Sequence, residues 1–263
     1  MQGTDDILSV ENLTLQFKGI KALSDVSLGA RRSRITAIIG PNGAGKTSLL
    51  NVVSGFYKAN AGGVTFNGED LLRRPAHARA RMGIARTFQN IALFRGMTVL
   101  ENVKLGAHAL LGANVITAQT YLGPAKREEN ELTAWLDTNV IDFLRLRAVR
   151  DREIVGLPMG VQKQVELARG LATRPDLLLL DEPFAGLNAT EKSAMASDIR
   201  RTVDRLGTSV VIIDHDMKTL MALADYVYVL NFGQLIAQGS PADVQASPQV
   251  IEAYIGAPLD EVG

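Results

Sequence analysis

The stretch GPNGAGKT at residues 40–47 constrains the fold of this chain more than any other feature. It matches the pattern G-x-x-x-x-G-K-[ST], follows the short apolar run TAIIG, and leads into a helical stretch, KTSLLNVVSGF. Glycines let a backbone turn its N–H groups inward around an anion, and a helix N-terminus adds partial positive charge. In this strand–loop–helix setting the pattern predicts a phosphate-binding loop within an α/β nucleotide-binding fold.

Chemical roles for the side chains of this loop follow from the same pattern. Gly40, Gly43 and Gly45 allow the tight backbone path around the anion. The Lys46 ammonium can reach the β- and γ-phosphates of a nucleotide, and the Thr47 hydroxyl can bind Mg²⁺. A phosphate loop alone does not distinguish a kinase from a GTPase or an ATPase.

Further apolar patterns predict the rest of the sheet. The runs at 177–181 and 209–214 are continuous, as in parallel strands that are covered on both faces. Residues 8–17 approximate the alternation of a strand with one buried face, and 226–239 are typical of a hairpin. A helix over 190–206 should end at Gly207. Alternating strands and helices predict an α/β domain with a largely parallel core sheet.

The middle of the chain is rich in helix formers and lacks strand-like alternation. We therefore expect one domain over 1–263, with a helical subdomain at 90–172 inserted into a core formed by 1–89 and 173–263. Apolar residues at three- and four-residue spacing predict an amphipathic helix over 127–147. Residues 112–126 should form an exposed connection, and the basic stretch at 73–81 should form a solvated helix.

Two acids and a histidine follow the later apolar runs. Asp181 ends LLLLD, Glu182 comes directly after it, and His215 follows SVVIID. Ligands of parallel sheets bind at the carboxyl ends of the strands. We expect Asp181 to hold the water shell of Mg²⁺, Glu182 to polarise an attacking water, and His215 to contact the γ-phosphate.

Composition excludes several other classes of function. Lysine and arginine total 28, and so do aspartate and glutamate, so no global basic field attracts nucleic acid. The chain has no cysteine, which excludes disulfides, thiolate zinc sites and a cysteine nucleophile. The N-terminus does not have the pattern of a secretory signal, and no apolar run reaches the roughly 18 residues of a membrane span.

The ordered motifs resemble those of ATPase subunits of ABC transporters. These motifs are GPNGAGKT, RTFQN, LPMGVQKQVELARGLA, LLLLDEP, AGLN and IIDHD, and they extend over nearly the whole chain. A finer likeness, to the ATPase subunits of branched-chain amino-acid importers, rests on GIARTFQNIALF, MTVLENV and the ending IEAYIG. The resemblance implies the fold of an ABC-type P-loop NTPase, in which an antiparallel β subdomain and an inserted helical subdomain accompany the core sheet. It also implies the hydrolysis of ATP with Mg²⁺.

The resemblance also implies roles for particular residues. Phe17 matches the aromatic residue that stacks on adenine. Gln89 in RTFQN matches a glutamine that contacts Mg²⁺ and water, and Glu182 and His215 match the general base and the γ-phosphate histidine. The expected contacts of the phosphate loop are Gly40, Asn42, Gly43, Ala44, Gly45, Lys46, Thr47 and Ser48. Asn188 replaces the usual aspartate of the motif at 185–188, which weakens the case for a charged contact across a dimer.

In such transporters two ATPase domains close head to tail on two ATP molecules. Each ATP lies between one phosphate loop and the L-S-G-G-Q helix end of the other domain, here represented by Leu157, Met159 and Gly160 acting in trans. A second helix N-terminus completes the cage of the γ-phosphate. The implied partners are a second ABC ATPase subunit, integral-membrane permease subunits and, indirectly, a substrate-binding protein. The implied location is the cytoplasmic face of the cell membrane.

The helix end LPMGV departs from L-S-G-G-Q at three positions. Pro158 replaces a serine whose hydroxyl would reach the γ-phosphate, and proline has no N–H. The importer branch tends to have L-P-Y-G-Q here, which leaves Met159 and Val161 as the more individual changes. We expect slowed but real hydrolysis.

Other functions remain open on the sequence alone. One is a subunit that binds ATP but hydrolyses it weakly, in a transporter for another amino acid or for urea. A soluble ABC-type ATPase of DNA repair or translation would share only the nucleotide motifs. A small-molecule kinase would need an acceptor pocket and a lid, and it would leave RTFQN, DEP and His215 unexplained together.

Overall fold

Two β-sheets and a group of helices make up the protein in this computed structural model, which describes residues 5–87, 92–107 and 124–255. One sheet has six strands in the order β10-β9-β3-β8-β7-β6, and the other has four in the order β2-β1-β4-β5. The layered α/β architecture predicted from the sequence is confirmed.

The six-stranded sheet is parallel except at one edge. β3 (Ile35–Ile39) lies beside β8 (Ser209–Ile213) and β9 (Tyr226–Asn231), and β7 (Leu177–Asp181) lies between β8 and β6 (Ile84–Arg86). β10 (Gln234–Gly239) pairs with β9 in the antiparallel sense, which confirms the predicted hairpin. All residues of β3, β7 and β8 are buried, as their continuous apolar sequences require.

The four-stranded sheet is entirely antiparallel. It contains β1 (Asp6–Phe17), β2 (Ile20–Arg31), β4 (Ala61–Phe66) and the short β5 (Glu69–Asp70). The register of β1 shifts around Asn12, which has a positive φ of 48°. The shift changes the alternation of buried residues along the strand. Phe17, the last residue of β1, is 43% exposed.

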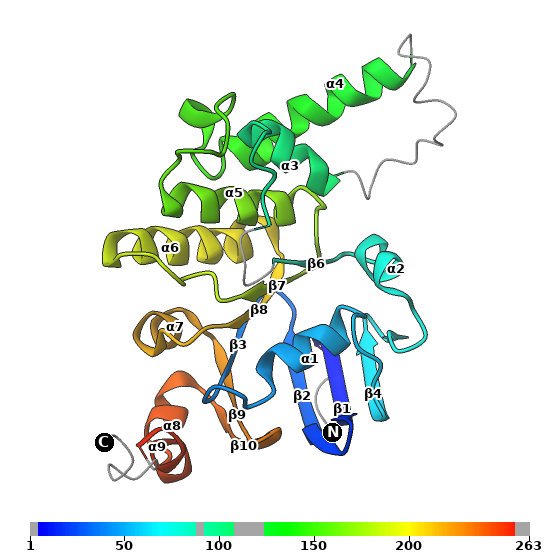
Figure 1. Ribbon diagram of the computed structural model, residues 1–263, viewed down its shortest axis with the longest axis vertical. Helices are drawn as coiled ribbons and strands as arrows, with labels where there is room; N and C mark the ends of the chain where they lie inside the picture. The colour runs from blue at the N-terminus through cyan, green and yellow to red at the C-terminus, as the bar shows by residue number, and fades with distance from the viewer. Residues whose placement is uncertain (1–4, 88–91, 108–123, 256–263) are drawn as a thin grey trace.

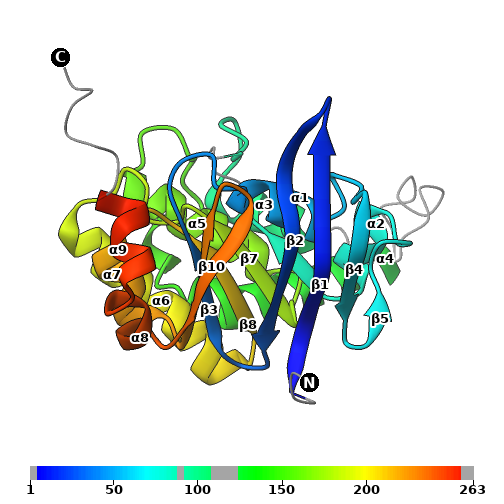
Figure 2. The ribbon, with the colours of Figure 1, turned by 90° about the horizontal axis from the view of Figure 1, so that it is seen from below.

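Helices enclose the six-stranded sheet and form a separate group at one end of the molecule. They are α1 (Lys46–Val53), α2 (Ala76–Arg81), α3 (Val99–Ala107), α4 (Pro124–Leu136), α5 (Met159–Leu171), α6 (Ala189–Leu206), α7 (Met217–Leu223), α8 (Pro241–Gln245) and α9 (Pro248–Ile255). Figure 1 shows α3, α4 and α5 together at one end, away from the antiparallel sheet. Figure 2 shows that sheet on one side of the molecule and α7, α8 and α9 on the other.

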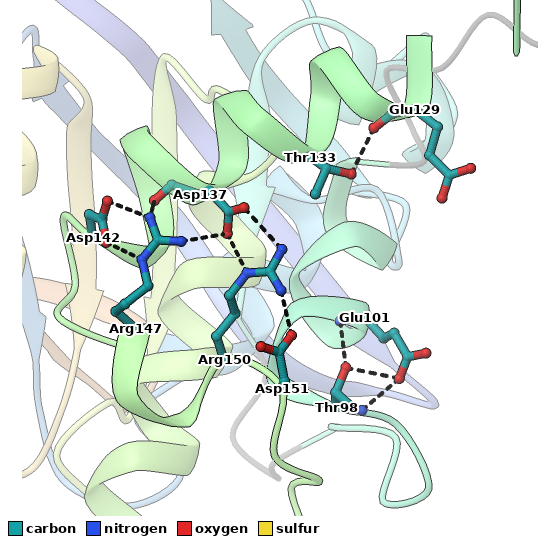
Figure 3. Close-up of polar contacts among 9 residues, drawn as sticks. All are labelled: Thr98, Glu101, Glu129, Thr133, Asp137, Asp142, Arg147, Arg150 and Asp151. Carbon is teal, nitrogen blue, oxygen red and sulfur yellow. Dashed lines mark hydrogen bonds and ion pairs between the residues drawn. The ribbon is translucent and has the colours of Figure 1, made fainter. Parts of the chain in front are cut away.

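The expected helix over 127–147 is wrong at its C-terminal end. α4 ends at Leu136, a π-helical turn follows at Asp137–Ile141, and Arg145 has a positive φ of 60°. Arg147 and Arg150 both reach the Asp137 carboxylate, at 3.4 and 2.6 Å (Figure 3). These ion pairs stabilise a turn where apolar spacing alone predicted another helical turn.

The structure corrects one further expectation, for residues 73–81, and describes only the last part of another, for residues 112–126. The basic stretch at 73–81 contains a helix, α2, but the expectation that it is solvated is wrong for Arg79, which is 4% exposed. Arg79 donates hydrogen bonds to the carbonyl oxygens of Val52 and Val53 at the end of α1. In the expected exposed connection at 112–126, residues 112–123 lie outside the described residues and 124–126 begin α4.

Candidate functional site

The phosphate loop between β3 and α1 follows a path that only glycine permits at two positions. Gly40 and Gly45 have φ values of 150° and 99°. A Cβ atom on Gly40 would lie 2.0 Å from the carbonyl oxygen of Leu230, and one on Gly45 would lie 2.5 Å from that of Ala22. Gly45 is also the N-cap of α1 and provides no side-chain cap. The N–H groups of the first helical turn are therefore available to an anion.

Neighbouring elements hold this loop in place. The Gly233 N–H in the β9–β10 hairpin donates to the carbonyl oxygen of Ala44 at 3.1 Å. The Ser24 N–H in β2 in turn donates to the carbonyl oxygen of Gly233 at 2.8 Å. The hydroxyl of Tyr254 in α9 is hydrogen-bonded to the Gly40 backbone. The loop is thus braced by both sheets and by the C-terminal helix.

Lys46 begins α1 and lies between the loop and the acids at the strand ends. Its Nζ donates to the carbonyl oxygens of Gly40 and Pro41 at 2.6 and 2.9 Å. An ammonium has three N–H bonds, so one more donor can turn toward a phosphate. Burial lowers the pKa of Lys46, and the charges of Glu182 and Asp181 oppose that shift. Lys46 therefore lies in the electrostatic field of both predicted acids.

Asp181 ends β7 and is almost completely buried. The Arg86 guanidinium donates to its Oδ2 at 3.0 Å, and the side chains of this ion pair are 7% and 1% exposed. Oδ1 of Asp181 is also buried but accepts no hydrogen bond from any described residue. A buried carboxylate oxygen without a partner is costly unless an ion or water occupies the position beside it.

Glu182 and His215 lie side by side at this edge of the sheet. Glu182 has a positive φ of 53°, and its N–H donates to the carbonyl oxygen of Ile213 at 2.8 Å. Its Oε2 is 4.0 Å from Nδ1 of His215, whose side chain is 67% exposed. The Lys163 ammonium on α5 donates to the Glu182 carbonyl oxygen at 3.3 Å. The structure therefore brings Lys46, Asp181, Glu182 and His215 into one site, as the sequence predicted.

An aromatic pair joins the end of β1 to the segment that follows α1. Phe17 meets Tyr57 edge to face, with 5.0 Å between the ring centroids. Tyr57 follows α1, and both side chains are partly exposed, at 43% and 38%. A planar base can stack on such an exposed ring. Phe17 was predicted from the sequence, whereas no motif indicated Tyr57.

Other predicted contacts of the loop occupy the expected element but differ in exposure. Asn42, Gly43 and Thr47 are exposed, and Ser48 is half-buried. Ala44 is buried against the core of the antiparallel sheet. Its side chain therefore packs inward, so only its backbone remains for a ligand. Gln89, predicted to contact Mg²⁺ and water, lies outside the described residues.

The start of α5, the predicted trans-acting helix end, packs against α6. Leu157 is buried, Pro158 is the N-cap without a side-chain cap bond, and Met159 is 44% exposed. A Cβ atom on Gly160 would lie 2.8 Å from Oε1 of Glu191. Gly160 therefore already serves close packing within this chain, a role that the sequence did not indicate.

Asn188 has a structural role that the sequence analysis missed. Its side chain accepts from the Glu191 N–H, and the Glu191 carboxylate accepts from the Asn188 N–H, each at 3.0 Å. This reciprocal pair is a capping box at the start of α6. The S/T/D/N-x-x-E pattern of N-A-T-E could have revealed it.

Buried basic residues near the site also escaped sequence analysis. Arg86 connects Asp181 to α1, and Lys163 on α5 is 4% exposed beside Glu166, which is 3% exposed. Their only sequence signal is a basic side chain within an otherwise apolar or helical stretch. Such a signal does not separate a buried cation from a solvated one.

Comparisons with known proteins agree with this geometry. Residues 23–185 match the sequence profile described as ABC transporter, and residues 234–260 match the one described as branched-chain amino acid ATP-binding cassette transporter. The chain is 36% identical over 250 residues to the high-affinity branched-chain amino acid transport ATP-binding protein BraF of Pseudomonas aeruginosa, covering 95% of this chain and 98% of that protein. It is 37% identical over 254 residues to LivG of Salmonella typhimurium, with the same coverage.

Solved structures extend the likeness to three dimensions. A nucleotide-free ATP-binding cassette from an ABC transporter superposes with a TM-score of 0.83 at 33% identity, covering 95% of this chain and 99% of that one. The ADP conformation of an ATP-binding cassette of an ABC transporter gives 0.84 at 34% identity, covering 96% and 100%.

Fold and site together define a P-loop ATPase, in which a phosphate loop faces two acids and a histidine at the strand ends. With the profile match over more than half of its length, the chain belongs to the ABC transporter family.

Proposed function

We propose that this chain is the ATP-hydrolysing subunit that energises an importer of branched-chain amino acids from the cytoplasmic face of the membrane. The observation that carries the substrate class is the match of residues 234–260, which lie outside the region common to ABC transporters, to a branched-chain profile. Relatives named as branched-chain transport proteins also align along nearly the whole chain.

The phosphates of ATP would bind between the loop and the strand ends. The N–H groups of the first turn of α1 and the Lys46 ammonium would hold the β- and γ-phosphates. Thr47 and Asp181 both offer oxygen atoms, which Mg²⁺ prefers as ligands. Oδ1 of Asp181 is also buried with no hydrogen-bond partner among the described residues. Gln89 would join them. When bound, the metal neutralises charge that develops on the phosphates.

Hydrolysis would use the side chains next to Asp181. The Glu182 carboxylate can accept a proton from the attacking water, and its backbone is held by Ile213 and Lys163. The exposed His215 imidazole can donate to the γ-phosphate. The start of α5 in a partner domain, through Leu157, Met159 and Gly160, would close the site from the other side. Phe17 would stack on the adenine.

Several partners follow from this proposal. No described helix is long and apolar enough to cross a membrane, so permease subunits would supply the membrane path. A second ABC ATPase subunit would complete the two nucleotide sites, and a substrate-binding protein would deliver the amino acid. The helical subdomain at 90–172 would pass the movement of closure to the permease.

Reconstitution of the co-purified transporter in proteoliposomes tests this function. Uptake of labelled leucine, isoleucine or valine should require ATP on the side of this chain and should stop with Glu182→Gln. ATP-driven uptake of urea or of a different amino acid would retain the ATPase role and reject the substrate. ATP binding with no turnover in the complete transporter would instead favour the weakly hydrolysing subunit.

A further inference from the structure

Arg86, the last residue of β6, connects the helix after the phosphate loop to the acid at the end of β7. Its Nη1 donates to Oδ1 of Asn51 and to Oγ of Ser54, both at 2.7 Å. Its Nη2 donates to Oδ2 of Asp181 at 3.0 Å. We propose that Arg86 is a positioning residue that fixes Asp181 relative to α1 for metal–nucleotide binding. This inference rests on the proposed function, because it requires that Asp181 serve Mg²⁺.

The burial of the ion pair makes the geometry rigid. The side chains of Arg86 and Asp181 are 7% and 1% exposed. A buried carboxylate costs free energy unless a charge and hydrogen bonds compensate it. A guanidinium does so with a planar fork of donors, so it fixes orientation as well as charge. A lysine at this position could not hold all three partners in the same way.

The ion pair assigns different tasks to the two oxygens of Asp181. Oδ2 is bound to Arg86, while Oδ1 is buried without a hydrogen-bond partner in the described part of the chain. Groups that hydrogen-bond a metal-binding carboxylate from behind orient its remaining oxygen. Arg86 therefore keeps Oδ1 directed to the position where the metal's water shell would lie.

The other bonds of Arg86 position α1. Ser54, the C-cap of this helix, donates its hydroxyl to the carbonyl oxygen of Leu50 at 2.5 Å, so its Oγ lone pairs face Arg86. α1 has eight residues and is about 12 Å long. Fixing the end of so short a helix also fixes Thr47 in its first turn. Thr47 and Asp181, two of the predicted metal ligands, are thus connected through one side chain.

Arg79 provides a matched control within the same structure. It is 4% exposed and binds the same end of α1, through the carbonyl oxygens of Val52 and Val53 at 2.5 and 2.8 Å. Its Nε donates to the carbonyl oxygen of Arg74 at 2.8 Å. Substitution of Arg79 therefore loosens α1 without removing the partner of Asp181.

The test measures ATP affinity with Mg²⁺ and with EDTA, in a Glu182→Gln background that blocks hydrolysis. The dissociation constant in EDTA divided by the dissociation constant with Mg²⁺ reports the coupling between metal and nucleotide. Arg86→Met should reduce this ratio about tenfold while changing the affinity in EDTA less than about threefold. Arg79→Met should leave the ratio unchanged, and Arg86→Lys should give an intermediate value.

The other possible results contradict either the positioning role of Arg86 or the metal role of Asp181. Equal effects of Arg86→Met and Arg79→Met on the ratio, or parallel losses with and without Mg²⁺, would mean that Arg86 only supports the fold. If Arg86→Met does not fold, a wild-type ratio in Arg86→Lys would overturn the proposal. A ratio of one in the Glu182→Gln protein itself would instead reject the metal role of Asp181 in the proposed function.

Discussion

The phosphate loop and the start of α5 both present a helix N-terminus without a side-chain cap, yet the chain surrounds them differently. Both sheets and α9 brace the phosphate loop, and the strand-end acids lie beside it. The start of α5 contacts α6 through Gly160 and leaves Met159 44% exposed. The difference supports the proposal that one half of the nucleotide site, here called the complete side, lies within this chain, whereas a partner domain would supply the other half.

The largest expected effect comes from the acid on the complete side. Glu182→Gln should lower ATP turnover about 100-fold or more, because it removes a general base while preserving the shape of the side chain. ATP affinity should stay within about threefold of wild type, since the side chain is not part of the phosphate loop. Steady-state phosphate release and equilibrium ATP binding measure the two quantities. Wild-type turnover in this variant would remove Glu182 as the base.

A pair of glycine substitutions compares the two helix ends directly. Gly40→Ala should weaken ADP binding by at least about tenfold, because its Cβ would lie 2.0 Å from a backbone oxygen of Leu230. Gly160→Ala should change it less than about twofold, since its Cβ meets only the flexible end of Glu191. Calorimetric titration with ADP measures both. Equal losses would show that the two ends are not as different as their surroundings suggest.

The smallest effect concerns the helix that follows His215. Hydrogen bonds from the Lys192 side chain and the Thr219 N–H lower the pKa of Asp216, the N-cap of α7, to about 2 from its ordinary value of 3.8. The native state therefore favours the charged carboxylate. Its stabilisation is fully present above pH 3.8 and is lost as the pH falls toward 2.

Denaturant unfolding of the wild type and of Asp216→Asn checks this assignment. The free energy of unfolding should differ by about 1–2 kcal/mol at pH 6, and the difference should decrease toward zero below pH 3. Lys192→Met should give a difference of the same sign. A difference that does not depend on pH would mean that Asp216 acts by packing and not by charge.

The sequence predicted the phosphate loop and the strand-end acids better than the surroundings of Arg86 and the start of α5. The phosphate loop and the strand-end acids could be read locally, because GPNGAGKT and LLLLDE set both backbone and side chains. The burial of Arg86 and the packing of Gly160 on Glu191 could not be predicted from local sequence, because both depend on segments that are distant in the chain. β2 has imperfect alternation, and no strand was predicted there.

The helical region was predicted in type but not in detail. Apolar spacing gave the helix at α4 but extended it to 147, past the left-handed Arg145. Ion pairs of Arg147 and Arg150 with Asp137 stabilise that turn (Figure 3), and periodicity does not detect such pairs. The division at 90–172 stays a prediction.

Gly160→Asp gives the most direct test of the central claim that the start of α5 serves a partner's nucleotide and not this chain's own. ADP affinity of the isolated chain should stay within about twofold of wild type. ATP turnover of the assembled ATPase pair should fall at least about tenfold, because a carboxylate added beside Glu191 brings negative charge to the helix end proposed to meet the γ-phosphate. Gly96→Asp, at an exposed position with open space around it, is the control. Parallel losses of ADP affinity and turnover, or unchanged turnover in a folded Gly160→Asp protein, would contradict the account.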